Sequence, residues 1–322
     1  MALPGTIDPF SMSSIQIDLE MAFLNRFIWL LLLCTAAVLR AAPVRVVVWD
    51  ERNAAERHLY TNFIGGQIAG YLKTLPGLSV KSASLNDPEQ GLSSQTLRDC
   101  DVLIWWSHVK NKAVPDSKAR EIVRRLKAGK LSLIVLHSAL TSRVFIDAMN
   151  ERTREDAARL VPPGVKTEFI PPKAYKDPLS TDPITPRIEM SRTPDGGRLA
   201  RVFLPICEIT GWREDGKPSE VTTLLPGHPI ARGVPKHFEL SHTELYLEPF
   251  HVPRPDAVIF SETHQGGQRF RSGMLWSVGK GKVFYFRPGH ETFPVFFNPN
   301  VLRILGNAAW WMGERAAPRK GS

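Results

Sequence analysis

The sequence has few cysteines, and this limits what can hold the fold together. There are 3 in 322 residues, and one of them, Cys34, lies within an apolar leader. The two that remain, Cys100 and Cys207, are far apart in the chain and do not form the disulfide framework of a small secreted domain. We expect two buried thiols, with a single bridge as the alternative.

The chain also lacks any nucleic-acid-binding motif, although its formal net charge is +9. Its 41 Lys and Arg are spread over the whole length. The densest cluster, between Lys118 and Lys130, is typical of the solvated face of a helix. A basic balance without a motif predicts charged surface, and we expect no nucleic-acid partner.

No apolar run is long enough to span a bilayer comfortably. Arg26 precedes the apolar stretch Phe27–Cys34, and small residues follow up to Ala42. This order of charge, apolar core and small residues predicts a signal peptide over about 21–42, and hence export to the periplasm or medium. Residues 1–20 are interpreted as a tag or start region. An uncleaved membrane anchor is the alternative; after cleavage we expect no stable membrane span.

The central stretch Ser132–Leu136 is an unbroken apolar run, which is typical of a parallel strand that is covered on both faces. Similar runs occur at Val44–Trp49, Val102–Trp106 and Val283–Phe286. In the segments between the first three runs in chain order, which end with Ser132–Leu136, apolar residues recur at helical spacing. Alternating strands and helices predict an α/β domain with a mainly parallel sheet flanked by helices. Its expected extent is 43–313, followed by a polar tail at 314–322.

A proline-rich, charged segment interrupts this pattern. Residues 151–201 contain Pro162, Pro163, Pro171 and Pro172 and further prolines beyond them. We interpret the segment as an inserted β-rich excursion of loops and short strands that packs on the domain.

Polar residues follow four of the predicted strands. Because the carboxyl ends of parallel strands meet at one edge of a sheet, we expect these residues to share a crevice. His242 and Glu244 are two residues apart and would lie on one face of an extended segment. The candidate catalytic residues are His137, Glu244, His242, Arg271, Arg287, His290 and Glu291. The candidate substrate-binding residues are Glu51, Trp106, His108 and Ser138, with the tryptophan as a surface for stacking a sugar ring.

The same residues could in principle support two other chemistries, a serine nucleophile and a metal site. Ser138 lacks the Gly-x-Ser-x-Gly turn of a serine nucleophile, which disfavours that role. His108, His137, His242 and His290 are ligand types for zinc or another divalent ion, although no short fixed ligand spacing supports a metal. A metal thus stays an open alternative to arginine as the group that stabilises charge.

Six short motifs, in this order along the chain, resemble the ThuA family of trehalose-utilisation proteins. They are Trp105–Val109, Ile134–Ser138, Gly227–Ile230, Ser241–Phe250, Phe270–Gly273 and Tyr285–Glu291. The resemblance implies a flavodoxin-like fold related to the class I glutamine amidotransferases. In those enzymes a cysteine follows the central strand, whereas here the turn is His137-Ser138-Ala139. Glutaminase chemistry through a thioester is therefore excluded at that position.

The resemblance further implies the catabolism of disaccharides through their 3-keto derivatives, beside a partner dehydrogenase that forms the ketone. A C3 ketone acidifies the C2 proton, so the enzyme needs a base and a group that holds the enolate oxygen. We expect His137 or Glu244 as the base and Arg271 or Arg287 as the charge-holding group. Hydrolysis, elimination and isomerisation remain open. So do a metal-dependent hydrolase of another polar substrate, a non-catalytic carbohydrate-binding module, and assembly as a homo-oligomer.

Overall fold

The computed structural model describes residues 42–314. The predicted signal peptide and the tail beyond residue 314 lie outside the described residues. Among the described helices, none is long and apolar enough to cross a membrane.

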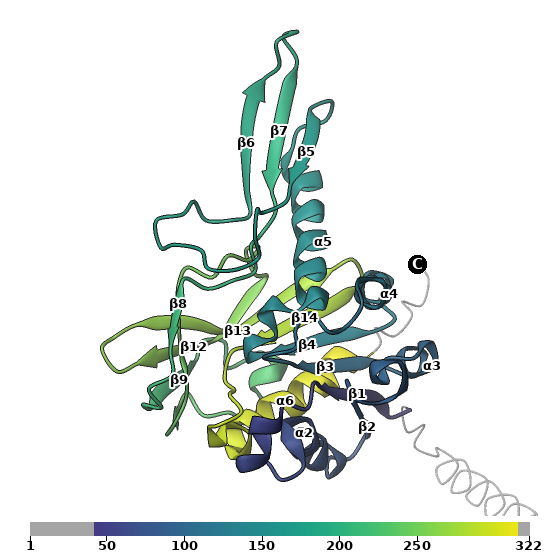
Figure 1. The fold of residues 1–322 in the computed structure, drawn as a ribbon, viewed down its shortest axis with the longest axis vertical. Coiled ribbons are helices and arrows are strands. Elements are labelled where there is room, and N and C mark those ends of the chain that lie inside the picture. Colours follow the sequence, from purple (N-terminus) through teal and green to yellow (C-terminus); the bar gives the residue numbers. More distant parts are fainter. Residues whose placement is uncertain (1–41, 315–322) are drawn as a thin grey trace, which may run out of the picture. The chain divides into compact units, whose positions relative to one another are not determined.

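A nine-stranded mixed sheet forms the centre of the domain (Figure 1). Across the sheet the strands are β10 (His237–Leu240), β9 (Ser219–Thr223), β12 (Ala257–His264), β13 (Arg269–Val278), β14 (Gly281–Phe286), β4 (Ser132–Leu136), β3 (Val102–Trp106), β1 (Val44–Asp50) and β2 (Leu78–Ser84). The five strands from β14 to β2 run parallel, and the other pairs are antiparallel. The predicted α/β fold class is confirmed.

Helices cover both faces of this sheet, because its strands are apolar on both. The longer helices are α2 (Phe63–Lys73), α4 (Asp116–Lys127), α5 (Arg143–Leu160) and α6 (Pro299–Gly313), and α3 (Ser94–Arg98) is short. Short 3-10 turns lie at Ala54–His58, Pro88–Gly91, His137–Thr141, Pro229–Ala231 and Pro294–Phe297. Trp105 packs with the α4 and α5 side, whereas its neighbour Trp106 packs with the α2 and α6 side. Successive strand residues thus feed two separate cores.

The segment expected to be an excursion from residue 151 begins later than predicted. Helix α5 continues through Glu151 to Leu160, where the Arg152–Asp156 pair supports another turn. The prolines start only at Pro162, so nothing breaks the helix before then. Beyond it, β5 (Lys166–Ile170), β7 (Arg198–Phe203) and β6 (Arg187–Arg192) form a separate three-stranded sheet at the far end of α5 (Figure 1).

One row of paired residues fixes the edge where the site forms. Phe286, Leu136, Trp106 and Asp50 lie side by side at the carboxyl ends of their parallel strands. The polar residues that follow these four strands therefore leave the sheet at the same level. A short ribbon of β8 (Gly211–Arg213) and β11 (Leu245–Leu247) contributes further residues to the same region.

Candidate active site

His137 occupies the turn directly after the central strand β4. Its backbone adopts a left-handed conformation with φ of 50°, which a side-chain-bearing residue rarely takes and which is common at functional sites. The imidazole Nδ1 lies 2.9 Å from the backbone oxygen of Arg287. Because a carbonyl oxygen can only accept, Nδ1 carries the ring proton, and Nε2 keeps its lone pair.

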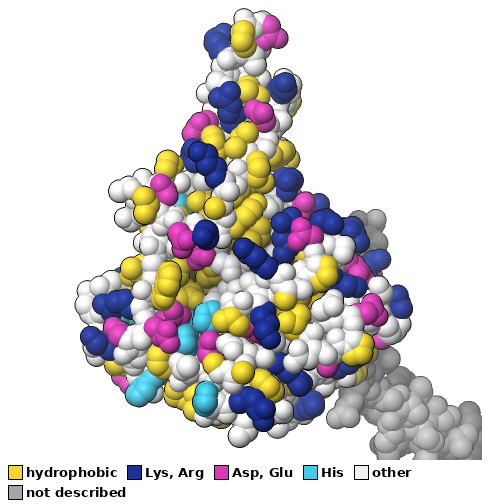
Figure 2. Space-filling model, in the orientation of Figure 1, with side chains coloured by type: hydrophobic (Ala, Val, Ile, Leu, Met, Phe, Trp, Pro, Cys, Tyr) yellow, Lys and Arg dark blue, Asp and Glu magenta, His cyan; other side chains and the backbone are white. Residues whose placement is uncertain are grey.

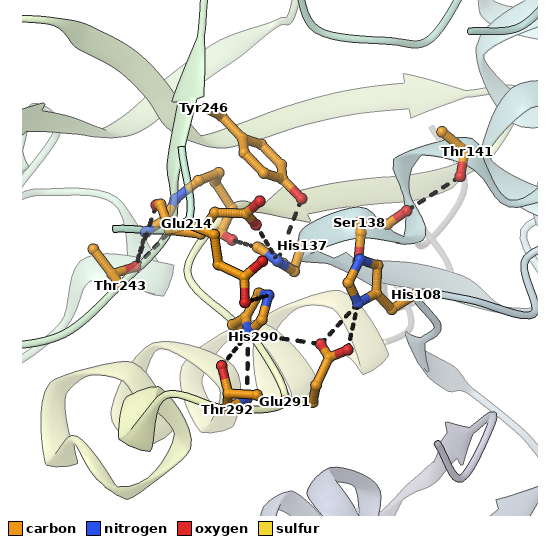
Figure 3. Close-up of polar contacts among 12 residues, drawn as sticks. His108, His137, Ser138, Thr141, Glu214, Thr243, Tyr246, His290, Glu291 and Thr292 are labelled. Carbon is orange, nitrogen blue, oxygen red and sulfur yellow. Dashed lines mark hydrogen bonds and ion pairs between the residues drawn. The ribbon is translucent and has the colours of Figure 1, made fainter. Parts of the chain in front are cut away.

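That lone pair faces a carboxylate. His137 Nε2 lies 2.8 Å from Glu244 Oε2. It lies 3.3 Å from the hydroxyl of Tyr246 (Figure 3). Burial, with the charges of Arg287 and His108, lowers the pKa of His137 well below its ordinary value. Burial raises the pKa of Glu244. Two lone pairs at this separation repel unless a proton lies between them, so the two groups form one acid–base pair.

His108 and Glu291 form a second pair, which is ionic. His108 Nδ1 lies 2.7 Å from each carboxylate oxygen of Glu291, and Asn53 also donates to that carboxylate. Although burial opposes the shift, the hydrogen bond and charge of His108 lower the pKa of Glu291 to about 2. The same partner outweighs burial at His108 and raises its pKa. His108 is thus the cation of the site, and its side chain is about one-third exposed (31%).

His290 completes a cluster of three imidazoles from different parts of the chain (Figure 3). Its ring centroid lies 5.5 Å from that of His108 and 5.6 Å from that of His137. The backbone N–H of Thr292 donates to His290 Nδ1, so the ring proton of the neutral form is on Nε2. Burial lowers the pKa of His290, and proximity to His137 acts in the same direction. His290 therefore offers an N–H donor to the cluster.

Arg287 supports this cluster from inside the protein. Its guanidinium is fully buried, pairs with the equally buried Glu262, and donates to Thr243 Oγ1 and to the backbone oxygen of Glu244. The sequence led us to expect Arg287 to carry charge on a substrate. With no exposed surface it holds Glu244 and His137 in place instead.

A cavity of about 220 Å³ opens beside these groups. It is lined by His108, Asn111, Ser138, Leu140, Thr141, Glu208, Ile209, Trp212, Glu214, Glu244 and Tyr246. Figure 2 shows histidine and acidic side chains gathered on this face, below the projecting β5–β7–β6 sheet. Glu208, Trp212 and Tyr246 line the cavity, although the sequence did not lead us to expect them in the site. Tyr246 lies in the family-like motif Ser241–Phe250, and Glu208 and Trp212 lie in the stretch Cys207–Glu214, which also resembles the family.

Two residues expected in the site lie elsewhere. His242 is exposed and contacts the backbone oxygen of its neighbour Ser241, whereas Glu244 is buried. The extended segment that would have placed both on one face ends at Leu240, so the prediction for His242 is wrong. Arg271 forms a two-point ion pair with Glu248 and does not line the cavity.

Of the residues expected to bind substrate, some line the cavity and others are buried behind it and hold its walls in place. Trp106 is fully buried, stacks behind His137 at a centroid distance of 5.8 Å and donates to Glu56, so it offers no face to a sugar. Glu51 is also buried and accepts the backbone N–H groups of Val109 and Lys110, which shapes the His108 loop. Ser138 and His108 do line the cavity, as expected.

Within residues 42–314, two sets of side chains could hold a metal ion by distance alone. They are His137 with Glu244 and His290, and His108 with His290 and Glu291. Glu244 Oε2 is buried and faces the His137 Nε2 lone pair at 2.8 Å, and a cation between the two atoms would satisfy both as a proton does. The N–H of Thr292, however, donates to His290 Nδ1, and a metal on Nε2 would require a proton on that same Nδ1. In the second set, His108 is already paired as a cation. His290 thus does not fit a metal ligand in this arrangement.

The sheet order, the strand-end histidines and the carboxylates define a flavodoxin-like α/β protein with an acid–base site at the carboxyl ends of its parallel strands. The family model ThuA, described as trehalose utilisation, matches residues 45–312. The chain belongs to the ThuA family, as its motifs predicted. No curated protein matches the chain.

The solved structures to which the chain is similar include two ThuA-like proteins. A ThuA-like protein from Parabacteroides merdae has 12% identity and a TM-score of 0.52, with 86% of this chain and 94% of that chain covered. A ThuA-like protein from Bacteroides uniformis has 13% identity and a TM-score of 0.49, with 84% and 92% covered. The first of these supports the α/β fold assignment.

Proposed function

We propose that this protein is an enzyme that removes the C2 proton of a 3-keto glycoside and so cleaves the glycosidic bond. The observation that carries the proposal is the Glu244–His137 pair, with its 2.8 Å separation, at the wall of a cavity that also contains the cationic His108. A base beside a cation is what proton abstraction next to a ketone requires.

Glu244 is the group that meets the substrate in this proposal. It lines the cavity, whereas His137 lies behind it with no exposed surface. In the form of the pair that has lost its shared proton to solvent, the Glu244 carboxylate takes the C2 proton, and the C–H electron pair forms an enolate on the C3 oxygen. When the enolate collapses, the C1–O1 bond breaks and the same proton passes to the departing oxygen. The products are an unsaturated ketone and a free sugar, and no electrons enter or leave.

His137 acts on Glu244 as a positioning residue. Its Nε2 lone pair, fixed by the Nδ1 contact with Arg287, faces Glu244 Oε2 and disfavours the bare carboxylate. Burial raises the pKa of Glu244 in the same direction. His108 holds the negative charge that develops on the enolate oxygen. Its ion pair with Glu291 keeps the imidazole protonated, so it replaces both arginines that the sequence suggested. A dehydrogenase that oxidises C3 would supply the substrate, in keeping with an exported protein.

The experiment is a turnover assay with 3-keto disaccharides, 3-keto-trehalose first, that follows free sugar release. Glu244→Gln keeps the shape of the side chain but cannot take a proton, so we expect the rate to fall about 10²–10⁴-fold, the usual contribution of a general base. His137→Gln should lower kcat to a lesser extent, because it removes the partner and leaves the base.

His242→Ala is the matched control, because this exposed histidine carries no role in the structure. It should retain full turnover. Full activity of Glu244→Gln, with all variants folded by circular dichroism, would refute the role of the pair. The absence of turnover by the wild type on every 3-keto disaccharide would refute the substrate class.

A further inference from the structure

Trp212 stands out because its large ring has no partner. Its exposed fraction is 61%, and its side chain makes no hydrogen bond or ring contact within the described part of the chain. The other described tryptophans are buried or make such contacts, as Trp310 does with the Pro76 oxygen and Trp311 with His228. Trp212 therefore contributes little to holding the fold.

The position of Trp212 links it directly to the acid–base pair. In the β8–β11 ribbon it lies opposite Tyr246, whose hydroxyl reaches His137 Nε2. Directly paired residues of an antiparallel ribbon point to the same side. Both rings line the cavity, with Tyr246 buried at its inner wall and Trp212 exposed. One face of the β8–β11 ribbon thus carries Tyr246 next to the reacting groups and Trp212 at the solvent-exposed end of the cavity.

The size of the cavity determines what can lie against Trp212. At about 220 Å³ it is smaller than the ~300–1,000 Å³ that is typical of pockets enclosing drug-sized ligands. One sugar ring fits beside Glu244, and the second ring of a disaccharide must lie at the rim. There the flat indole offers an apolar face for the C–H face of a pyranose, and the carboxylates of Glu208 and Glu214 can accept from its hydroxyls.

We propose that Trp212 is the stacking platform for the second sugar ring, the ring that departs, and that it sets the preference for disaccharides over glycosides with a small aglycone. This rests on the proposed function, because it takes Glu244 as the point where the first ring reacts. The stacking contact is equally strong in the ground state and in the transition state, so it affects KM and leaves kcat unchanged.

The test compares wild type, Trp212→Ala and Trp212→Tyr on 3-keto-trehalose and on methyl 3-keto-glucoside. An aromatic contact of ~1 kcal/mol predicts a rise in KM of about fivefold for the disaccharide in Trp212→Ala. KM for the methyl glycoside and kcat for both should stay at wild-type values, and Trp212→Tyr should recover most of the loss. Leu224→Ala is the control, because Leu224 is 46% exposed and does not line the cavity.

Calorimetric binding of trehalose to the same variants separates the two proposals. If the wild type binds trehalose but converts no 3-keto sugar, the proposed reaction fails, and weaker binding by Trp212→Ala alone still supports the platform. An equal loss for disaccharide and methyl glycoside, or no loss for either, overturns it. A wild type that binds no disaccharide overturns it as well.

Discussion

The buried ion pair beneath the site gives the sharpest energetic prediction. Arg287 and Glu262 are both fully buried, and Glu262 also accepts from Ser219. Arg287 cannot lose its proton, so its charge stays in the core whatever happens to its partner. Glu262→Gln removes the compensating charge and keeps the shape of the side chain.

The expected cost follows from the environment of the pair. Breaking a buried ion pair by removing one partner costs about 3–5 kcal/mol, since the remaining charge has lost both water and counter-ion. The bonds from Arg287 to Thr243 and to the Glu244 oxygen remain, so we expect the lower half of that range. Against a total stability of roughly 5–15 kcal/mol this is a large fraction, and Tm should fall by about 10 °C.

Equilibrium unfolding in urea measures this cost from the shift in midpoint at an unchanged slope. Glu248→Gln is the control, because Glu248 pairs with Arg271 where both are partly exposed, and such pairs contribute about 0–1 kcal/mol. Burial alone raises the pKa of Glu262, and Arg287 opposes that shift. If Glu262→Gln changed stability no more than the control, the carboxyl would be protonated in the folded state, and our reading of an ionised pair would be wrong.

Three further predictions concern the site. In Gly289→Ala the new methyl carbon would lie 2.6 Å from His137 Cβ, so we expect kcat to fall at least tenfold; wild-type kcat would contradict the tight packing. Burial raises the pKa of Glu208 to about 7, so the folded state binds an extra proton and stability should fall by up to about 3 kcal/mol as pH rises from 4.5 to 7. Urea unfolding across that pH range should show that the stability of Glu208→Gln falls less steeply with pH than that of the wild type. The same dependence of stability on pH in both proteins would count against the raised pKa of Glu208. Dialysis against EDTA should leave turnover unchanged, whereas loss of activity with loss of a stoichiometric metal would show that His290 rearranges to bind it.

Much of the site could be predicted because one rule of sheet geometry places it. Strands with apolar residues on both faces are recognisable from local sequence, and parallel strands must end at a common edge. His108, His137 and Glu291 were found in this way, although nearly two hundred residues of chain lie between the first and the last.

The errors arise where no such rule applies. His242 was placed on the assumption that its segment is extended, but β10 ends at Leu240. Beyond a strand end, a change of backbone direction by one residue is enough to turn a side chain from the core to the solvent, as happens at His242. Arg287 was recognised as important, yet its role depends on burial against Glu262, which only the assembled core reveals. Trp212 and Glu208 lie on irregular segments, whose course is set by long-range packing and leaves no local periodicity to read.

The place of β14 has a consequence for synthesis of the protein. This strand joins β4 to β13 in the middle of the sheet, yet it is the last strand to be translated. While its residues remain in the ribosome, β4 presents an open apolar edge of the kind that pairs with other chains. The Arg287 carbonyl that orients His137 is also missing until then. We expect a nascent chain to pass through an aggregation-prone stage, and a product truncated before residue 281 to lack the ordered site even if its first strands and helices have formed.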